Sequence, residues 1–137
     1  MSDTRYALSA DLPMPLPAAR AVVTELLKQE GFGILTEIDV KATLKAKIGA
    51  DIEPYLILGA CNPRFAHEAL LAEEGLGILL PCNVALKEVA PGKTRVWLTR
   101  VPGLFSLVDN DAMGPVAAVV GGVMEKVVQE LRRTAEA

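Results

Sequence analysis

A short apolar run, Tyr55 to Ala60, constrains the fold of this chain more than any other feature. Pro54 precedes the run and Cys61-Asn62-Pro63 follows it, so both of its ends are well marked. An uninterrupted apolar segment of this kind suits a central strand that is buried on both faces. Asn62 and Pro63 then predict the start of a helix through Glu74, because asparagine caps free backbone N–H groups and proline fits the first turn.

Strand and helix patterns alternate along the rest of the chain. Further strands are expected at residues 4–10, 32–38, 76–80, 84–89 and 94–100. Apolar residues at helical spacing predict helices over residues 19–27 and 116–131, and Asp39 is a predicted N-cap for a short helix that ends before Gly49. The pattern predicts one α/β domain of the α+β type over residues 1–137. We expect a single twisted sheet of about five to six strands, largely antiparallel or mixed, covered by helices and followed by a long C-terminal helix.

Several glycines and prolines predict local geometry. Gly31 is expected to end the first helix, because glycine tolerates the left-handed conformation found just beyond a helix. Pro91-Gly92 suits a type II turn, which makes the flanking segments an antiparallel hairpin. Gly121-Gly122 lies inside the last predicted helix, where two glycines cost about 1 kcal/mol each relative to alanine, so we expect a close contact there.

Residues 30–35 and 74–79 have nearly the same sequence, Glu-Gly-Phe-Gly-Ile-Leu and Glu-Gly-Leu-Gly-Ile-Leu. Each is expected to follow a helix and open a strand. The similarity has two interpretations, an internal repeat or two helix-to-strand junctions that use the same capping residues. Neither segment is a dinucleotide-binding fingerprint, because the glycine spacing differs and the strand would follow the glycines.

The composition excludes several classes of function. The chain has 137 residues, 51% of them hydrophobic, and a net charge of -3 without runs of like charge. This argues against nucleic acid and membrane as partners. The first residues lack the pattern of a signal peptide, so a cytoplasmic location is expected. In that reducing compartment the two cysteines are more often free thiols, ligands or redox groups than a structural disulfide.

Cys61 and Cys82 are the main candidates for chemistry. Cys61 immediately precedes the predicted N-cap, where the positive end of the helix dipole would favour a thiolate. The alternative is a small buried apolar residue at the end of a core strand. If the strands that carry the two cysteines are neighbours, three outcomes remain open: a reversible disulfide, a two-thiolate metal site completed by another donor, or two packing residues.

Four polar residues near the cysteines are further candidates. His67 is the chain's single histidine and suits either surface packing or a role as ligand or proton carrier. Asn62 and Asn83 have a capping or turn role as their first explanation. Arg64 lies in the first helical turn, where a cation opposes the dipole, so it is either a solvated side chain or part of an anion site.

The segments 55–63, with Ala66, and 79–84 carry a family resemblance. They resemble the pattern of the family catalogued as domain of unknown function 302, and the similarity extends from about Gly31 to Arg100. The resemblance implies an α/β sandwich with one twisted sheet covered by helices, members that associate as dimers, and no cofactor. The positions that match the shared motif have no established catalytic role in that family: Cys61, Asn62, Pro63, Pro81 and Cys82.

These observations lead to one hypothesis and two alternatives. The hypothesis is a non-enzymatic homodimer without a cofactor, which binds a small polar or anionic ligand near Asn62, Arg64, Cys82 and Asn83. The apolar segment 101–111 motivates the dimer, because such connections are commonly covered by a partner. One alternative is a redox or metal-binding protein that uses Cys61 and Cys82 with His67, and the other is a purely structural or interaction domain.

Overall fold

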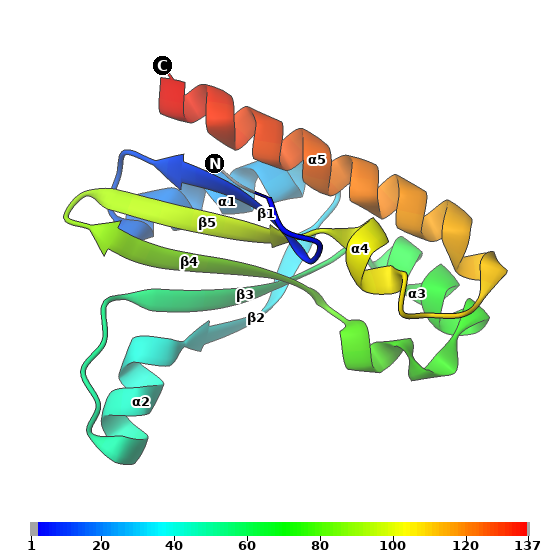
Figure 1. The fold of residues 1–137 in the computed structure, drawn as a ribbon, viewed down its shortest axis with the longest axis horizontal. Helices are drawn as coiled ribbons and strands as arrows, with labels where there is room; N and C mark the ends of the chain where they lie inside the picture. Colours follow the sequence, from blue (N-terminus) through cyan, green and yellow to red (C-terminus); the bar gives the residue numbers. More distant parts are fainter. Residues whose placement is uncertain (1–2, 137) are drawn as a thin grey trace.

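The computed structural model describes residues 3–136; Met1, Ser2 and Ala137 of the predicted domain lie outside the described residues. Its centre is one antiparallel sheet of five strands in the order β1-β5-β4-β3-β2 (Figure 1). The strands are β1 (Ala7–Leu12), β2 (Gly33–Asp39), β3 (Tyr55–Cys61), β4 (Cys82–Ala90) and β5 (Lys93–Thr99). The predicted fold class is therefore confirmed, with the sheet fully antiparallel.

The helices lie around this sheet (Figure 1). They are α1 (Leu16–Gln29), α2 (Val40–Ile48), α3 (Pro63–Ala72), α4 (Val101–Phe105) and the long α5 (Gly114–Glu136), with the 3-10 helices η1 (Glu74–Leu79) and η2 (Asp111–Met113). The buried faces of α1 and α5 pack together on one face of the sheet and belong to the same hydrophobic core. Helices α3 and α4 and the 3-10 helix η1 lie at one end of the sheet, beyond the last residues of β3 (Figure 1).

The register of the strands explains which side chains form the core. One row of side chains crosses four neighbouring strands, and each of its members is at most 1% exposed. The row consists of Leu8, Leu98, Val84 and Leu58. Their neighbours along each strand point to the other face, because side chains alternate in a strand. Ile57 is accordingly half-buried. The prediction that residues 55–60 are buried on both faces is therefore wrong for Tyr55 and Ile57 on the second face, which α1 and α5 do not cover, although Gly59 on that face is buried.

The predictions for the two ends of α2 and for the hairpin are confirmed. Asp39 accepts a 2.9 Å hydrogen bond from the Ala42 N–H at the start of α2, and Gly49 ends that helix at φ 69°. Gly92, at φ 72°, lies between β4 and β5, which pair antiparallel. These features depend on residues close in sequence, so a sequence pattern is sufficient to predict them.

The strand expected at residues 76–80 is wrong. Residues Glu74–Leu79 form the 3-10 helix η1, and α3 ends at Ala72 instead of Glu74. The physical reason is that β4, which begins shortly after this segment, already has β3 and β5 on its two sides, and the free edge of β2 lies beyond β3, so no free strand edge is next to this segment. The two similar hexapeptides therefore have different structures, and neither interpretation of their similarity holds.

The contact expected at the glycine pair is confirmed for Gly121. A Cβ atom there would lie 3.0 Å from Cδ of Pro102, so α4 packs closely on α5 at this point; a Cβ atom on Gly122 would meet open space. Val101 and Phe105, on α4, are buried by the same packing. Much of the apolar character of segment 101–111 is thus explained by contacts within the chain, although Leu107 is 77% exposed.

Candidate functional site

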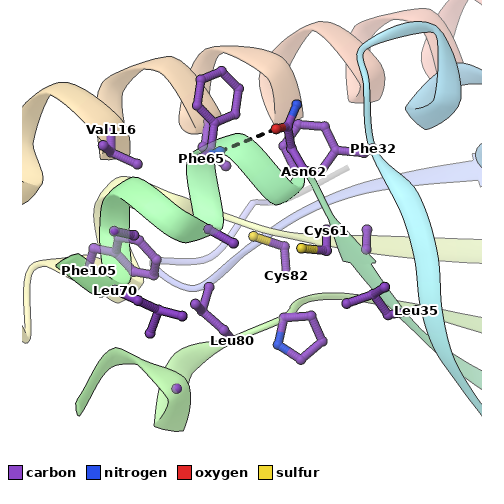
Figure 2. Close-up of a pocket in the computed structure, with 16 residues that line it drawn as sticks. Phe32, Leu35, Cys61, Asn62, Phe65, Leu70, Leu80, Cys82, Phe105 and Val116 are labelled. Atoms are coloured by element: carbon purple, nitrogen blue, oxygen red, sulfur yellow. Dashed lines mark hydrogen bonds between the residues drawn. The ribbon is translucent and has the colours of Figure 1, made fainter. Parts of the chain in front are cut away.

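The sheet brings the two cysteine motifs together. Strands β3 and β4 are antiparallel neighbours, and Ala60 lies opposite Cys82. Cys61 follows Ala60 and is therefore a diagonal neighbour of Cys82. Figure 2 shows both sulfur atoms at the wall of one cavity, and neither cysteine is in a disulfide. The spatial convergence on which the functional hypotheses depend is present.

The cavity has a volume of about 310 Å³ and lies where β3 and β4 meet α3, η1 and α5. Its lining is almost wholly apolar, and Asn62 and the two thiols are its polar exceptions. The residues that line it are Phe32, Leu35, Ala60, Cys61, Asn62, Phe65, Ala66, Ala69, Leu70, Gly77, Leu80, Pro81, Cys82, Phe105, Val116 and Val120. All three phenylalanines of the chain are among them.

Asn62 has the predicted structural role. Its side-chain oxygen accepts hydrogen bonds from the backbone N–H groups of Arg64 (3.1 Å) and Phe65 (3.3 Å), as Figure 2 shows for Phe65. The first-turn amides of α3 are therefore already bonded, and they are not free to bind an anion. The cap instead fixes the start of α3, which carries Phe65 to the wall of the cavity.

The end of α1 places Phe32 on the same wall. Gly31 has φ 83°, Phe32 N–H bonds to the Leu27 carbonyl and Gly31 N–H to the Lys28 carbonyl, which together make a Schellman motif. The predicted role of Gly31 is thus confirmed. The rings of Phe32 and Phe65 lie 6.4 Å apart, centroid to centroid, with their planes tilted by 39°. The C-terminal end of α1 and the N-terminal end of α3 therefore position these two aromatic rings of the cavity wall.

Burial determines the state of both thiols. It raises the pKa of Cys61, and burial together with the nearby Cys61 raises the pKa of Cys82 to about 11. The expectation that the helix dipole favours a thiolate at Cys61 is therefore wrong, because desolvation opposes the charged form and the cap occupies the nearest amides. Protonated thiols are poor nucleophiles and poor metal ligands. Within residues 3–136 no group of three or more His, Cys, Asp or Glu side chains is arranged to hold a metal ion.

The other predicted site residues lie outside this cavity. Arg64 and His67 line an adjoining surface depression with Asn62, Pro63 and Phe65. Asn83 is exposed and follows Cys82 on β4, so its side chain points to the other face of the sheet. The ligand-binding roles of these residues stay predictions, and only Asn62 and Phe65 belong to both the depression and the cavity.

Sequence reasoning missed the aromatic and aliphatic walls of the cavity. Phe32, Phe65 and Phe105 are far apart in sequence and each fits an ordinary amphipathic pattern. The available signal was that aromatic residues are scarce, 4% of the chain. A gathering of these few rings at one place is informative, but it becomes visible only when their positions in space are known.

None of the helices in the described range 3–136 is both long and apolar enough to cross a membrane. Comparison with curated proteins gives no significant match. Among solved structures, the chain is similar to the crystal structure of an uncharacterized conserved protein DUF302 from Bacillus stearothermophilus. The TM-score is 0.84 and the identity 25%, over 94% of this chain and 100% of that one. The family model "Domain of unknown function DUF302" matches residues 8–131, which include all of the sheet except Ala7, both cysteine motifs and the whole cavity lining. The chain therefore belongs to the DUF302 family.

Proposed function

We propose that this protein is a non-enzymatic binding domain whose cavity beside Cys61 and Cys82 takes an apolar small molecule, or the apolar part of one. The observation that carries the proposal is the cavity itself, about 310 Å³ with all three phenylalanines on its walls. Protein interiors are close-packed, so a space of this size is unusual unless it is used. Its volume is at the lower end of the range for small-molecule pockets, roughly 300–1,000 Å³, which are mostly lined by apolar and aromatic side chains.

The ligand site is at the location expected from the sequence, but its ligand is apolar where the sequence led us to expect a polar or anionic one. A polar ligand buried in this cavity would leave its own hydrogen-bonding groups without partners, because the lining offers few. Such a loss costs roughly 1–3 kcal/mol for each unsatisfied group. An apolar group there instead gains about 25 cal/mol per Å² of surface removed from water.

The cavity has an evident opening. Leu35 on β2 and Leu70 on α3 both line it, yet they are 66% and 39% exposed. Figure 2 shows Leu80 between them, and Pro81 also lines the cavity. A side chain that touches both the cavity and bulk water marks the mouth of a pocket, so we place the entrance between β2 and α3. A ligand can then enter without unfolding of the sheet.

A titration with 1-octanol, followed by backbone amide NMR shifts, tests the proposal. We expect saturable shifts that centre on the cavity residues Ala60, Ala69 and Phe105. Ala66 is a half-buried lining residue on α3, so Ala66→Phe should fill part of the cavity and weaken binding by roughly tenfold, about 1.4 kcal/mol. Ala46→Phe on the exposed surface of α2 is the matched control. Non-saturable shifts, or equal binding by the two variants, would contradict the proposal.

We also propose that the domain is a homodimer, with the face of the sheet opposite α1 and α5 as its interface. An apolar stripe crosses four strands of that face, and its members are Ile38, Ile57, Ala85 and Trp97. Ile38 is 48% exposed and the others are half-buried. A contiguous apolar stripe on a sheet is costly in water, and a two-fold axis would pair the stripe with its copy.

Light scattering coupled to size-exclusion chromatography tests the dimer. Wild-type protein should elute with twice the 14.6 kDa mass of the chain. Ile57→Lys should shift it to the monomer, because it places a charge in the middle of the stripe. Gln129→Lys adds the same charge on the exposed surface of α5, on the other side of the sheet, and is the control that should stay dimeric. A monomeric wild-type protein at micromolar concentration would refute this part and leave the cavity proposal intact.

A further inference from the structure

The apolar cavity and the polar depression beside it share a wall. Asn62 and Phe65 line both, whereas Arg64 and His67 line only the depression. The two spaces thus meet at the first turn of α3. On the basis of the proposed function, we infer that the ligand is amphipathic: a small monocarboxylate whose chain or ring occupies the cavity and whose carboxylate lies beside Arg64.

The charge of Arg64 is available for such a group. Within residues 3–136 no carboxylate lies within ion-pairing distance of its guanidinium. The first turn of α3 also contains no acidic residue. A cation in that turn is disfavoured by the helix dipole, so the position gains stability when an anion pairs with it. Arginine suits a carboxylate in particular, because its planar fork donates two parallel hydrogen bonds.

The backbone amides at the start of α3 take no part in binding the carboxylate. Asn62 already accepts hydrogen bonds from the N–H groups of Arg64 and Phe65, and the Ala66 N–H bonds to the Asn62 carbonyl. The guanidinium is therefore the group that would recognise the anion, and a ring N–H of His67 adds a hydrogen-bond donor on the same side. Asn62 and Phe65 form the boundary at which the polar end of the ligand would meet its apolar end.

The geometry also limits the size of the ligand. A cavity of about 310 Å³ suits a straight chain of modest length or a single aromatic ring, and long acyl chains would extend through the opening at Leu35 and Leu70. A doubly charged phosphate is less well matched, because only one arginine borders the depression. Octanoate is therefore a suitable probe, and 1-octanol is its uncharged counterpart of equal chain length.

Isothermal titration of the full chain with each probe, below the micellar range, tests the inference. We expect octanoate to bind wild-type protein roughly fivefold more tightly than 1-octanol. This is the gain in affinity that one solvent-accessible ion pair provides. Arg64→Met should remove that difference and leave octanol binding unchanged, because the methylene stem is kept. Lys47→Met, which removes an exposed cation from α2 at the other end of the molecule, should change neither affinity.

The outcomes separate this inference from the proposal on which it rests. Equal binding of both probes, unaffected by Arg64→Met, would overturn the carboxylate assignment and support the apolar cavity. Equal loss of octanoate affinity in Arg64→Met and Lys47→Met would also overturn it, because it would indicate attraction to overall charge. Absence of binding by either probe would refute both the inference and the proposed function.

Discussion

The core beneath α1 and α5 and the cavity beneath α3 are made of similar residues, yet one is filled and the other is open. In the core, Leu58, Leu98 and Met124 have no exposed surface. At the end of the sheet, Phe65 and Leu80 are half-buried and enclose space. The difference is geometric: α1 and α5 lie directly on the strands, whereas α3 and η1 extend past the ends of β3 and β4. Apolar composition alone therefore does not determine whether a region is packed.

Truncating one side chain in each region gives the largest expected effect. Leu98→Ala should lower the free energy of unfolding by about 2–5 kcal/mol, because it leaves a cavity in a close-packed core. Phe65→Ala should cost about 1–2 kcal/mol, since its ring is only half-buried and already borders open space. Urea denaturation measures both values. Equal losses would mean that the wall of the cavity is packed as tightly as the core.

Enlarging one alanine in each region should have opposite effects. Ala10→Leu, at a position with no exposed surface, should destabilise the protein by about 1–3 kcal/mol through overpacking. Ala66→Leu faces the cavity and should stabilise it by about 0.5–1 kcal/mol, because the added atoms fill existing space. Thermal unfolding monitored by circular dichroism provides the comparison. Destabilisation by Ala66→Leu as large as that by Ala10→Leu would show that the space is not available.

Cys82 lies where the two regions meet, and its thiol gives a pH test of burial. Its pKa is about 11 in the folded protein against an ordinary value of 9.0, so the folded state holds the proton more tightly than the unfolded state. The resulting stability is fully present below pH 9 and is lost as pH rises toward 11.

At pH 10 the loss should be about 1 kcal/mol in the wild-type protein. Urea titrations of wild type and Cys82→Ala at pH 8 and pH 10 isolate this contribution, because other titrating groups are common to both. A loss of the same size in Cys82→Ala would mean that the thiol is hydrated in the folded protein. It would also revive the redox and metal-binding alternative, which requires an accessible thiolate.

The N-cap of α3 gives the smallest expected effect, in a comparison of two asparagines near the cavity. Asn62→Ala should cost about 1 kcal/mol, because two first-turn amides lose their acceptor. Asn83→Ala, at an exposed strand position, should change stability by less than about 0.5 kcal/mol. Chemical denaturation of the two variants measures the difference. If the two asparagines had the same effect, the cap would not be what positions Phe65.

The sequence was most informative where the structure depends on neighbouring residues. The Asp39 cap, the turn at Gly92 and the helix end at Gly31 each follow from one or two side chains, and all three were predictable. Residues 76–80 show the limit of this reasoning. An apolar pentapeptide suits a strand or a turn of helix equally well, and the pairing of β4 with β3 and β5, which leaves no free strand edge beside this segment, decided between them.

The candidate site divides in the same way. Cys61, Asn62 and Cys82 were identifiable because they lie at element boundaries, where strands end and helices begin. The apolar nature of the site was not, because Phe32, Phe65 and Phe105 come from three separate segments. The raised pKa values of the thiols were likewise unpredictable, since desolvation depends on every atom that surrounds a group.

By itself the sequence therefore determined the helix caps, the hairpin, the fold class and the two motifs around the cysteines, because short-range hydrogen bonds and side-chain periodicity specify them. Only the tertiary structure decided that β3 and β4 are neighbours, that η1 is not a strand, and that the phenylalanines gather around an unfilled space. Those outcomes depend on which strands pair and how far each helix lies from the sheet, and both are set by contacts between residues distant in sequence.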